Sequence, residues 1–302
     1  MLKKIIGISF TLLIVAVLVF ILIRNPKQTR FTVVKESYNT VSIKDEESSI
    51  VIDFYINKKD SFITDVNNIA TAYISDQNQN NLINIDVEEF NYVGSIKIDN
   101  EKFYLYKINI GIDFNNDIEL KEAYLQINYY NQENLKVNIG SFSSYKIDSF
   151  GSNNLSITNL KGIVNMVNGK KTLVGFAIKL NNINNKNIDV LNIIPLDVNL
   201  ECGRASDVKN INIKSNKEIN AYLDYPYLFD QKTEFKPLTI NSEKYLLVPV
   251  YYNNHFEINN FGLKIDYQIG GLNKCFYFNE FTFFIDHERT IDLTNLTFYH
   301  YG

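Results

Sequence analysis

The chain has 302 residues and a formal net charge of −4 at pH 7. The first 30 residues carry five basic side chains and no acidic one, residues 31–150 carry 10 basic and 19 acidic side chains, and residues 151–302 carry 15 of each. This distribution offers no broad basic face for phosphates, so it argues against nucleic acid as a partner.

The composition favours strands over helices. The chain contains 21 Phe and 20 Tyr and is rich in Ile, whereas it has two Met and no Trp. β-Branched and aromatic side chains fit a pleated, half-buried surface, and Ala and Met are the helix formers that are scarce here. We therefore expect an all-β body.

The N-terminal segment predicts a membrane anchor. Residues 5–23 are 19 consecutive residues without a charge, and a helix of that length is about 28 Å long, close to the hydrocarbon thickness of a bilayer. A cleaved signal peptide is the alternative, but no small-x-small cleavage site follows the apolar run. We predict a short cytoplasmic head at residues 1–4, a transmembrane helix at residues 5–23 that binds the lipid bilayer, a linker at residues 24–30, and a body on the extracytoplasmic side of the cell membrane.

The first half of the body shows strand patterns. Residues 49–56 are rich in β-branched and aromatic side chains. Residues 103–113 alternate with period two, which places Phe103 on one face and Tyr104 on the other. Residues 124–130 and 135–139 flank a short polar turn and predict a hairpin. We assign residues 31–147 to a first β-sandwich domain.

The second half follows a break rich in Gly, Ser and Asn at residues 148–156. Asn168 and Gly169 separate two apolar strands and favour a type I′ hairpin turn, because both central positions need positive φ. Further strands are expected at residues 245–252, 261–269 and 275–284, and Pro249 within the first of them favours an edge strand. We assign residues 150–302 to a second β-sandwich domain.

The predicted fold class is therefore all-β, with tandem β-sandwich domains behind one N-terminal transmembrane helix. The layout is immunoglobulin-like at the level of architecture. The Trp that fills the core of immunoglobulin domains is missing, and Asn273 stands where a tyrosine corner before Cys275 would need Tyr. The pattern thus indicates an architecture and no family.

The two cysteines, Cys202 and Cys275, both lie in the second half. An even cysteine count in an exported domain favours a disulfide, which would close a loop of about 73 residues and stabilise the fold by about 4 kcal/mol in the chain-entropy model. The alternative is a pair of unbonded, buried thiols.

A group of aromatic residues between residues 222 and 229 is the candidate for contact with a partner protein. Tyrosine is enriched at protein interfaces because it offers a rigid apolar ring and a polar tip. Packing in the core or at a sheet edge is the alternative interpretation. The candidate contact residues are Tyr222, Tyr225, Tyr227 and Phe229.

Catalytic and metal-binding patterns are incomplete. Asp286 and Glu288 flank His287, but neighbours on a strand point to opposite faces and do not converge. Residues 76–81 and 113–117 imitate the start of a calcium loop, yet both lack the Gly at position six and the Glu at position twelve. Turns built from Asn and Asp explain both segments. We predict no catalytic residue, no metal, no cofactor and no enzymatic activity.

These observations favour a membrane-anchored extracytoplasmic binding or accessory protein, a non-enzymatic subunit of a membrane or cell-envelope assembly such as a transporter, with a protein partner. One alternative is surface adhesion or ligand capture by the distal domain, with Asn-rich loops as the contact surface. An envelope hydrolase that uses carboxylates or His287 is the third hypothesis.

Overall fold

The computed structural model describes residues 28–114, 116–167, 170–207, 234–253, 260–282 and 296–301. Within these residues the fold is all-β, as predicted, with two short 3₁₀ turns, η1 (Phe62–Thr64) and η2 (Val66–Asn68), and no α-helix. No helix in the described residues is long and apolar enough to span a membrane. The predicted anchor at residues 5–23 lies outside the described residues.

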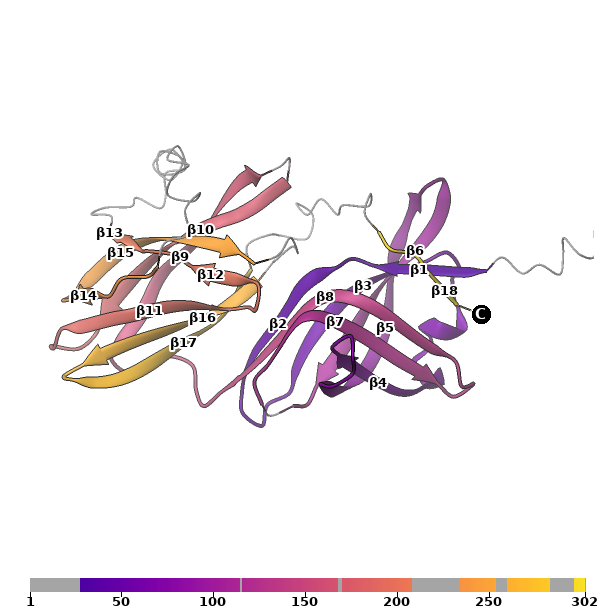
Figure 1. Ribbon diagram of the computed structural model, residues 1–302, viewed down its shortest axis with the longest axis horizontal. Helices are drawn as coiled ribbons and strands as arrows, with labels where there is room; N and C mark the ends of the chain where they lie inside the picture. The colour runs from indigo at the N-terminus through magenta and orange to yellow at the C-terminus, as the bar shows by residue number, and fades with distance from the viewer. Residues whose placement is uncertain are drawn as a thin grey trace, which may run out of the picture.

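The first part is one curled sheet of nine strands, which forms a half-barrel (Figure 1). All neighbours in it are antiparallel except β2 and β8, which run parallel. In spatial order the strands are β18 (Tyr299–Tyr301), β1 (Thr29–Val33), β3 (Ser48–Ile56), β6 (Glu101–Ile112), β5 (Leu82–Ile98), β4 (Ile69–Ser75), β7 (Ile118–Tyr129), β8 (Asn134–Ile147) and β2 (Glu36–Ile43).

The concave face of this sheet holds a single core. On β6, Tyr106, Ile108 and Ile110 are buried in it, as the period-two pattern predicted, and residues from β1 to β8 complete it. Phe103 points the other way and is buried in a second, smaller cluster with Phe298. The predicted sandwich of two sheets is therefore wrong for this part, because one long twisted sheet curls and packs against itself.

The end of the chain returns to this first sheet. Tyr299 on β18 pairs with Phe31 on β1, and the two rings stack with centroids 5.6 Å apart. The side chain of Thr32 donates to the carbonyl oxygen of Thr297 at 2.7 Å. The nine-stranded sheet thus contains residues from both ends of the described chain, whereas the sequence assigned residues up to 302 to the second domain.

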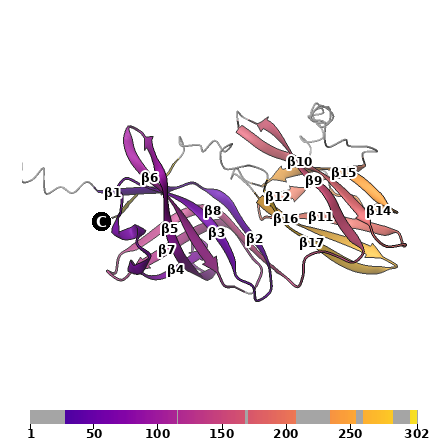
Figure 2. The same cartoon turned by 180° about the vertical axis from the view of Figure 1, so that it is seen from behind.

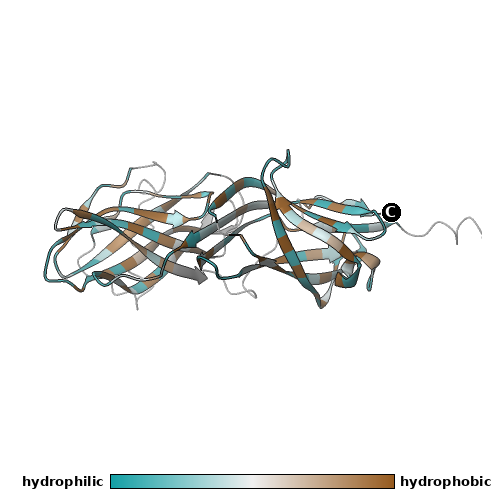
Figure 3. Ribbon diagram, turned by 90° about the horizontal axis from the view of Figure 1, so that it is seen from below, coloured by the Kyte–Doolittle hydropathy of each residue, from teal (hydrophilic) through white to brown (hydrophobic). Residues whose placement is uncertain are grey.

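The second part consists of two smaller sheets that face each other across one shared core. The first contains β12 (Leu200–Cys202), β15 (Glu243–Tyr252), β10 (Lys170–Asn182) and β9 (Leu155–Val167), with β13 (Ser206–Asp207) also paired to β15. The second contains β14 (Leu238–Ile240), β11 (Ile188–Leu196), β16 (Asn260–Ile269) and β17 (Leu272–Thr282). Apolar and polar residues alternate along many strands of both parts (Figure 3).

Two predicted hairpins are confirmed. Strands β7 and β8 are antiparallel around residues 130–133, and β9 and β10 are antiparallel with Val167 paired to Lys170. The Asn168–Gly169 turn itself lies outside the described residues.

The prediction of an edge strand at Pro249 is wrong. Strand β15 pairs with β10 on one side and with β12 and β13 on the other. Pro249 is tolerated because it lies opposite the gap between those two short strands, where Cys202 pairs with Val250 and Ser206 with Leu247. A missing N–H therefore breaks no ladder bond at this position.

The two parts lie end to end (Figures 1 and 2) and are joined by a buried polar junction. The carboxylate of Asp197 accepts hydrogen bonds from Ser37 Oγ at 2.7 Å and from Asn39 Nδ2 at 3.2 Å, both on β2. Asn199 Nδ2 donates to Ser37 Oγ at 2.9 Å and also to Ser141 Oγ on β8. Polar groups of β2 and β8 that would otherwise be buried without partners are thereby satisfied by the second part.

Candidate functional site

The end of the second part that lies farthest from the first part is formed by four connections (left-hand end of Figure 1). They are residues 152–154 before β9, residues 183–187 between β10 and β11, residues 241–242 between β14 and β15, and residues 270–271 between β16 and β17. We call them the distal loops. The strand register brings them together, since Ile188 pairs with both Ile240 and Ile269.

Asn182, the last residue of β10, ties two of the distal loops together. Its backbone N–H donates to the carbonyl oxygen of Ser242 at 2.7 Å. Its side-chain amide nitrogen donates to the carbonyl oxygens of Lys186, Ile240 and Asn241, at 2.8, 3.0 and 3.2 Å. This one side chain thus donates to three loop carbonyl oxygens that would otherwise accept hydrogen bonds from water.

Asn184 and Asn154 connect a third loop. Asn184 Nδ2 donates to Asn154 Oδ1 at 2.8 Å, and the backbone N–H of Asn184 donates to Asn182 Oδ1 at 2.9 Å. Asn154 Nδ2 in turn donates to the hydroxyl of Tyr267 at 3.1 Å, and this hydroxyl lies 2.8 Å from Ser152 Oγ. Tyr267 is buried in the core, so the network is anchored to the rigid interior.

The fourth loop is a two-residue hairpin turn. Gly270 and Gly271 both have positive φ, at 58° and 79°, which is the type I′ pattern that glycine adopts without strain. A Cβ placed on Gly270 would lie 3.8 Å from Lys186 Nζ, so this turn lies beside the loop at residues 183–187. The four distal loops therefore lie at one end, and hydrogen bonds join three of them.

Two large aliphatic side chains are exposed at this end, one in a distal loop and one at the first residue of β17. Ile183 is 57 % exposed and Leu272 is 66 % exposed, while Asn184 is part-buried and Asn185 is exposed. The nearest ion pair, between Lys179 Nζ and Glu243 at 2.7 Å, is internally neutral, and the hydrogen bond to Glu243 raises the pKa of Lys179. The surface thus combines two exposed apolar side chains with amide groups and the exposed ammonium of Lys186, which suits contact with a protein.

The predicted disulfide is absent. Cys202 and Cys275 are both free thiols in the structure. Cys202 packs against the core from β12, and burial raises its pKa. Cys275 belongs to β17 in the opposite sheet, where its neighbour Phe276 points into the core and Cys275 itself is exposed. Because successive strand residues point to opposite faces, the Cys275 side chain faces away from Cys202.

The candidate partner-contact residues, and the incomplete catalytic pattern around His287, lie outside the described residues. This applies to Tyr222, Tyr225, Tyr227 and Phe229, and to Asp286, His287 and Glu288. His300 is described and is an exposed residue of β18.

The calcium-like segments behave as turns where they are described. The carboxylate of Asp76 accepts hydrogen bonds from Asn80 N and Asn81 Nδ2, both at 2.9 Å, and Asp117 accepts one from Lys146 N at 2.8 Å. The part of the chain that the structure describes contains no group of three or more His, Cys, Asp or Glu placed to bind a metal.

The sequence carried a signal for the distal loops. Asparagine recurs at positions 181, 182, 184, 185 and 187, between two strands. This density marks a loop in which side-chain amides replace backbone partners. The individual residues that bond, and the loops that they join, follow from strand pairing and cannot be read from the run itself.

Comparisons with known proteins gave structural matches only. No protein-family model and no curated protein matches the sequence. Among solved structures, a chain described as the wild-type BspA C-terminal region is 10 % identical, with a TM-score of 0.19, and the match covers 83 % of this chain and 99 % of that one. The C-terminal domain of the Streptococcus agalactiae antigen I/II polypeptide BspA is 11 % identical, with a TM-score of 0.16 over 83 % and 99 % of the two chains. The C-terminal domain of the Streptococcus pyogenes antigen I/II-family protein AspA is 8 % identical, with a TM-score of 0.18 over 84 % and 98 %.

Proposed function

We propose that this protein captures a ligand at the cell surface, as an adhesin does, and that the distal loops are its contact surface. The observation that carries the proposal is the set of side-chain amide bonds that joins three of these loops, together with the exposed side chains of Ile183 and Leu272 at the same end.

Two physical arguments support contact at this end. Loops that are already fixed lose little conformational entropy on binding, which favours affinity. An apolar centre with a polar rim is also the usual anatomy of a protein contact surface. The distal loops lie at the opposite end of the molecule from Thr29 and Tyr301, so a tether at the N-terminus leaves them outermost.

The cellular setting of the proposal comes from the sequence. A transmembrane helix at residues 5–23 with the body outside the cytoplasm would place the distal loops at the surface. The immunoglobulin-like layout, the absence of enzymatic activity and a protein partner within a membrane assembly remain predictions.

Binding by the full-length protein in lipid nanodiscs tests the proposal. The loaded nanodiscs are applied to an array of glycans and to an array of purified extracellular-matrix proteins. We expect at least one array component to bind the wild type and to lose binding to the variants Ile183→Asp and Leu272→Asp. Val51→Asp, which changes an exposed residue of the first part, is the matched control and should bind as the wild type does. Binding that is equally strong in all variants would place the contact elsewhere and overturn the proposal.

A further inference from the structure

The opposite end of the molecule contains a row of aromatic side chains that begins at the buried Tyr129 and reaches the surface at its neighbours. Ring centroids of Phe62 and Tyr129 are 5.7 Å apart, and those of Tyr129 and Tyr301 are 6.0 Å apart. Tyr130 follows directly and is 72 % exposed, and Phe62 is 41 % exposed. We call Phe62, Tyr129, Tyr130 and Tyr301 the aromatic end.

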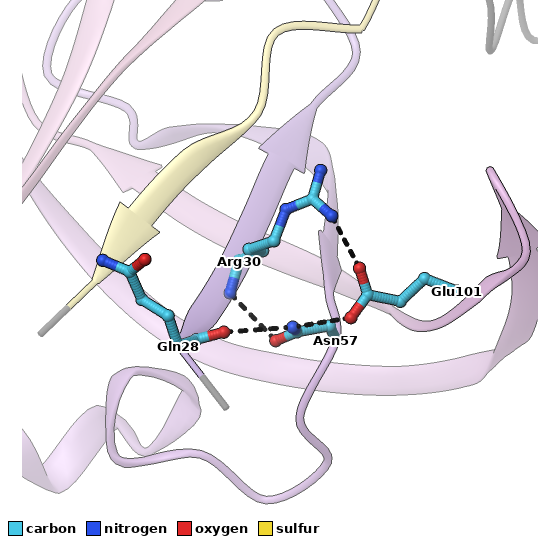
Figure 4. A network of polar contacts seen from close by, with 4 residues as sticks. All are labelled: Gln28, Arg30, Asn57 and Glu101. Atoms are coloured by element: carbon cyan, nitrogen blue, oxygen red, sulfur yellow. Dashed lines mark hydrogen bonds and ion pairs between the residues drawn. The ribbon is translucent and has the colours of Figure 1, made fainter. Parts of the chain in front are cut away.

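The aromatic end lies where the described chain begins. Thr29 is the register partner of Tyr301, so the first strand starts beside this row. Asn57 holds the chain at the same place, since its side chain donates to the carbonyl oxygen of Gln28 at 3.2 Å and accepts from the N–H of Arg30 at 2.9 Å (Figure 4). Arg30 is further fixed by an ion pair of 2.7 Å to Glu101. The point at which the chain enters the body is thus rigidly defined.

The predicted transmembrane helix at residues 5–23 would hold the aromatic end close to a bilayer, because few residues separate the two. Ile23 is the last residue of the apolar run, and Gln28 is already attached to the body. Five residue steps span at most about 18 Å when fully extended. The headgroup layer on each side of the hydrocarbon is about 5–8 Å thick. A body held by so short a connection has its entry point at, or just above, the headgroups.

The side chains at this end are of the types that prefer that layer. Tyrosine is enriched at the boundary between hydrocarbon and water, because its ring is apolar and its hydroxyl is polar. Lys58 and Lys59 are exposed in the loop that precedes Phe62, and long basic side chains reach phosphate groups while their stems stay in apolar surroundings.

The acidic groups at this end are in part already engaged. Asp65 accepts from Asn67, Glu101 from Arg30, and Glu133 from Asn131, whereas Asp60 and Asp99 are exposed to solvent. Most of these carboxylates are therefore already hydrogen-bonded within the chain.

We propose that the aromatic end rests in the headgroup layer of an anionic bilayer, with Phe62 and Tyr130 at the acyl boundary and Lys58 and Lys59 on lipid phosphates. The contact orients the body so that the distal loops point away from the membrane. It uses residues that the proposed ligand contact does not use, so either proposal can fail without the other.

The chain contains no Trp, so a single introduced Trp reports its own surroundings. Full-length Tyr130→Trp and Phe62→Trp variants are placed in vesicles of phosphatidylcholine and phosphatidylglycerol, with and without bromine on the acyl chains. We expect blue-shifted emission and clear quenching by the brominated lipid for both variants. Leu272→Trp, at the distal loops, is the control and should show red-shifted emission that bromine leaves unchanged.

Two further variants separate contact by these side chains from proximity imposed by the linker. Charge reversal at Lys58 and Lys59 to Glu in the Tyr130→Trp background should reduce the quenching, and more so in vesicles rich in phosphatidylglycerol. Insertion of a flexible Gly/Ser segment of 12 residues between Lys27 and Gln28 should leave the quenching in place. Emission from both end-positioned Trp variants that matches the distal control, or quenching that disappears with the longer linker, would overturn the proposal.

Discussion

Ser37 Oγ on β2 donates a hydrogen bond of 2.7 Å to Asp197 Oδ2, across the junction between the two parts of the molecule. The carboxyl group is almost fully buried, and burial raises its pKa, while the hydrogen bonds from Asn199, Ser37 and Asn39 oppose that rise. The two parts are therefore joined by a carboxyl group whose charge state depends on pH, which leads to the first prediction.

Asp197→Asn should change how stability depends on pH. A raised pKa in the folded state means that the folded protein binds the proton more tightly than the unfolded chain does. The free energy of unfolding of the wild type therefore falls as pH rises from the ordinary Asp pKa of about 3.9 through the raised pKa of the folded state. The variant has no carboxyl group at this position and lacks this pH dependence. We expect the variant to be less stable than the wild type at about pH 4, with a deficit that shrinks toward pH 7. Urea unfolding of both proteins across this range measures the deficit, and a deficit that grows with pH would contradict the assignment.

Phe298→Ala should loosen the return of the chain to the first sheet. The ring of Phe298 lies 5.3 Å from that of Phe103 and 4.6 Å from the guanidinium carbon of Arg30. Because the ring is only partly buried, its removal should lower the free energy of unfolding by about 1–3 kcal/mol. His300→Ala, an exposed change two residues later on β18, is the control and should change the free energy of unfolding by less than about 0.5 kcal/mol. Equal effects of the two changes in urea unfolding would show that β18 adds nothing through side-chain packing.

Gly140→Ala should disrupt the parallel pairing of β8 with β2. Gly140 has a φ of 109°, and an added Cβ would collide with the backbone of Glu36, its register partner. The unfavourable backbone conformation and the collision both destabilise the folded state, so we expect the free energy of unfolding to fall by about 2–4 kcal/mol. Gly94→Ala is the matched control, since a Cβ there meets no atom within 4 Å. Thermal unfolding of the two variants should separate them clearly, and similar midpoints would speak against the strained geometry at Gly140.

Asn182→Ala should release the distal loops without unfolding the core. The change removes the amide that donates to three carbonyl oxygens, with an expected loss of about 1–2 kcal/mol. Amide hydrogen exchange should rise at residues 183–187 and 241–242 and stay unchanged in β6. Asn185→Ala, an exposed change in the same loop, should leave the exchange pattern as it is in the wild type.

The two thiols should differ in reactivity. Cys275 is exposed and should react with a maleimide in the native protein, whereas Cys202 is packed against the core and should react only after unfolding. Mass spectrometry of the labelled protein should show one added group before denaturation and two after it. A protein that takes up no label in denaturant until a reductant is added would instead contain the disulfide.

Part of the fold could be read from local patterns. The alternation of Tyr106, Ile108 and Ile110 with polar neighbours identifies β6 and the face that it buries, because side chains on a strand alternate with period two. The polar turns between apolar runs identify the hairpins β7–β8 and β9–β10 for the same local reason.

The candidate site could be read only in outline. The asparagine run before β11 indicates a loop rich in side-chain hydrogen bonds, but Asn182 and Asn184 bond to residues in two other loops. Which loops meet depends on the pairing of β11 with β14 and β16, and strand pairing between distant segments leaves no mark on a single run of residues.

By itself the sequence determined the all-β class, several strands and their buried faces, and an apolar N-terminal run of bilayer length. The tertiary structure alone decided that nine strands curl into one sheet, that Cys202 and Cys275 face apart, and that β18 returns to β1. A strand of three residues is too short to carry a periodic pattern, and its place is set by contacts such as that of Phe31 with Tyr299. Strand β2 is hidden for a related reason: its Ser37 and Asn39 have the composition of an exposed strand, and they are buried because Asp197 and Asn199 of the second part cover them and bond to them.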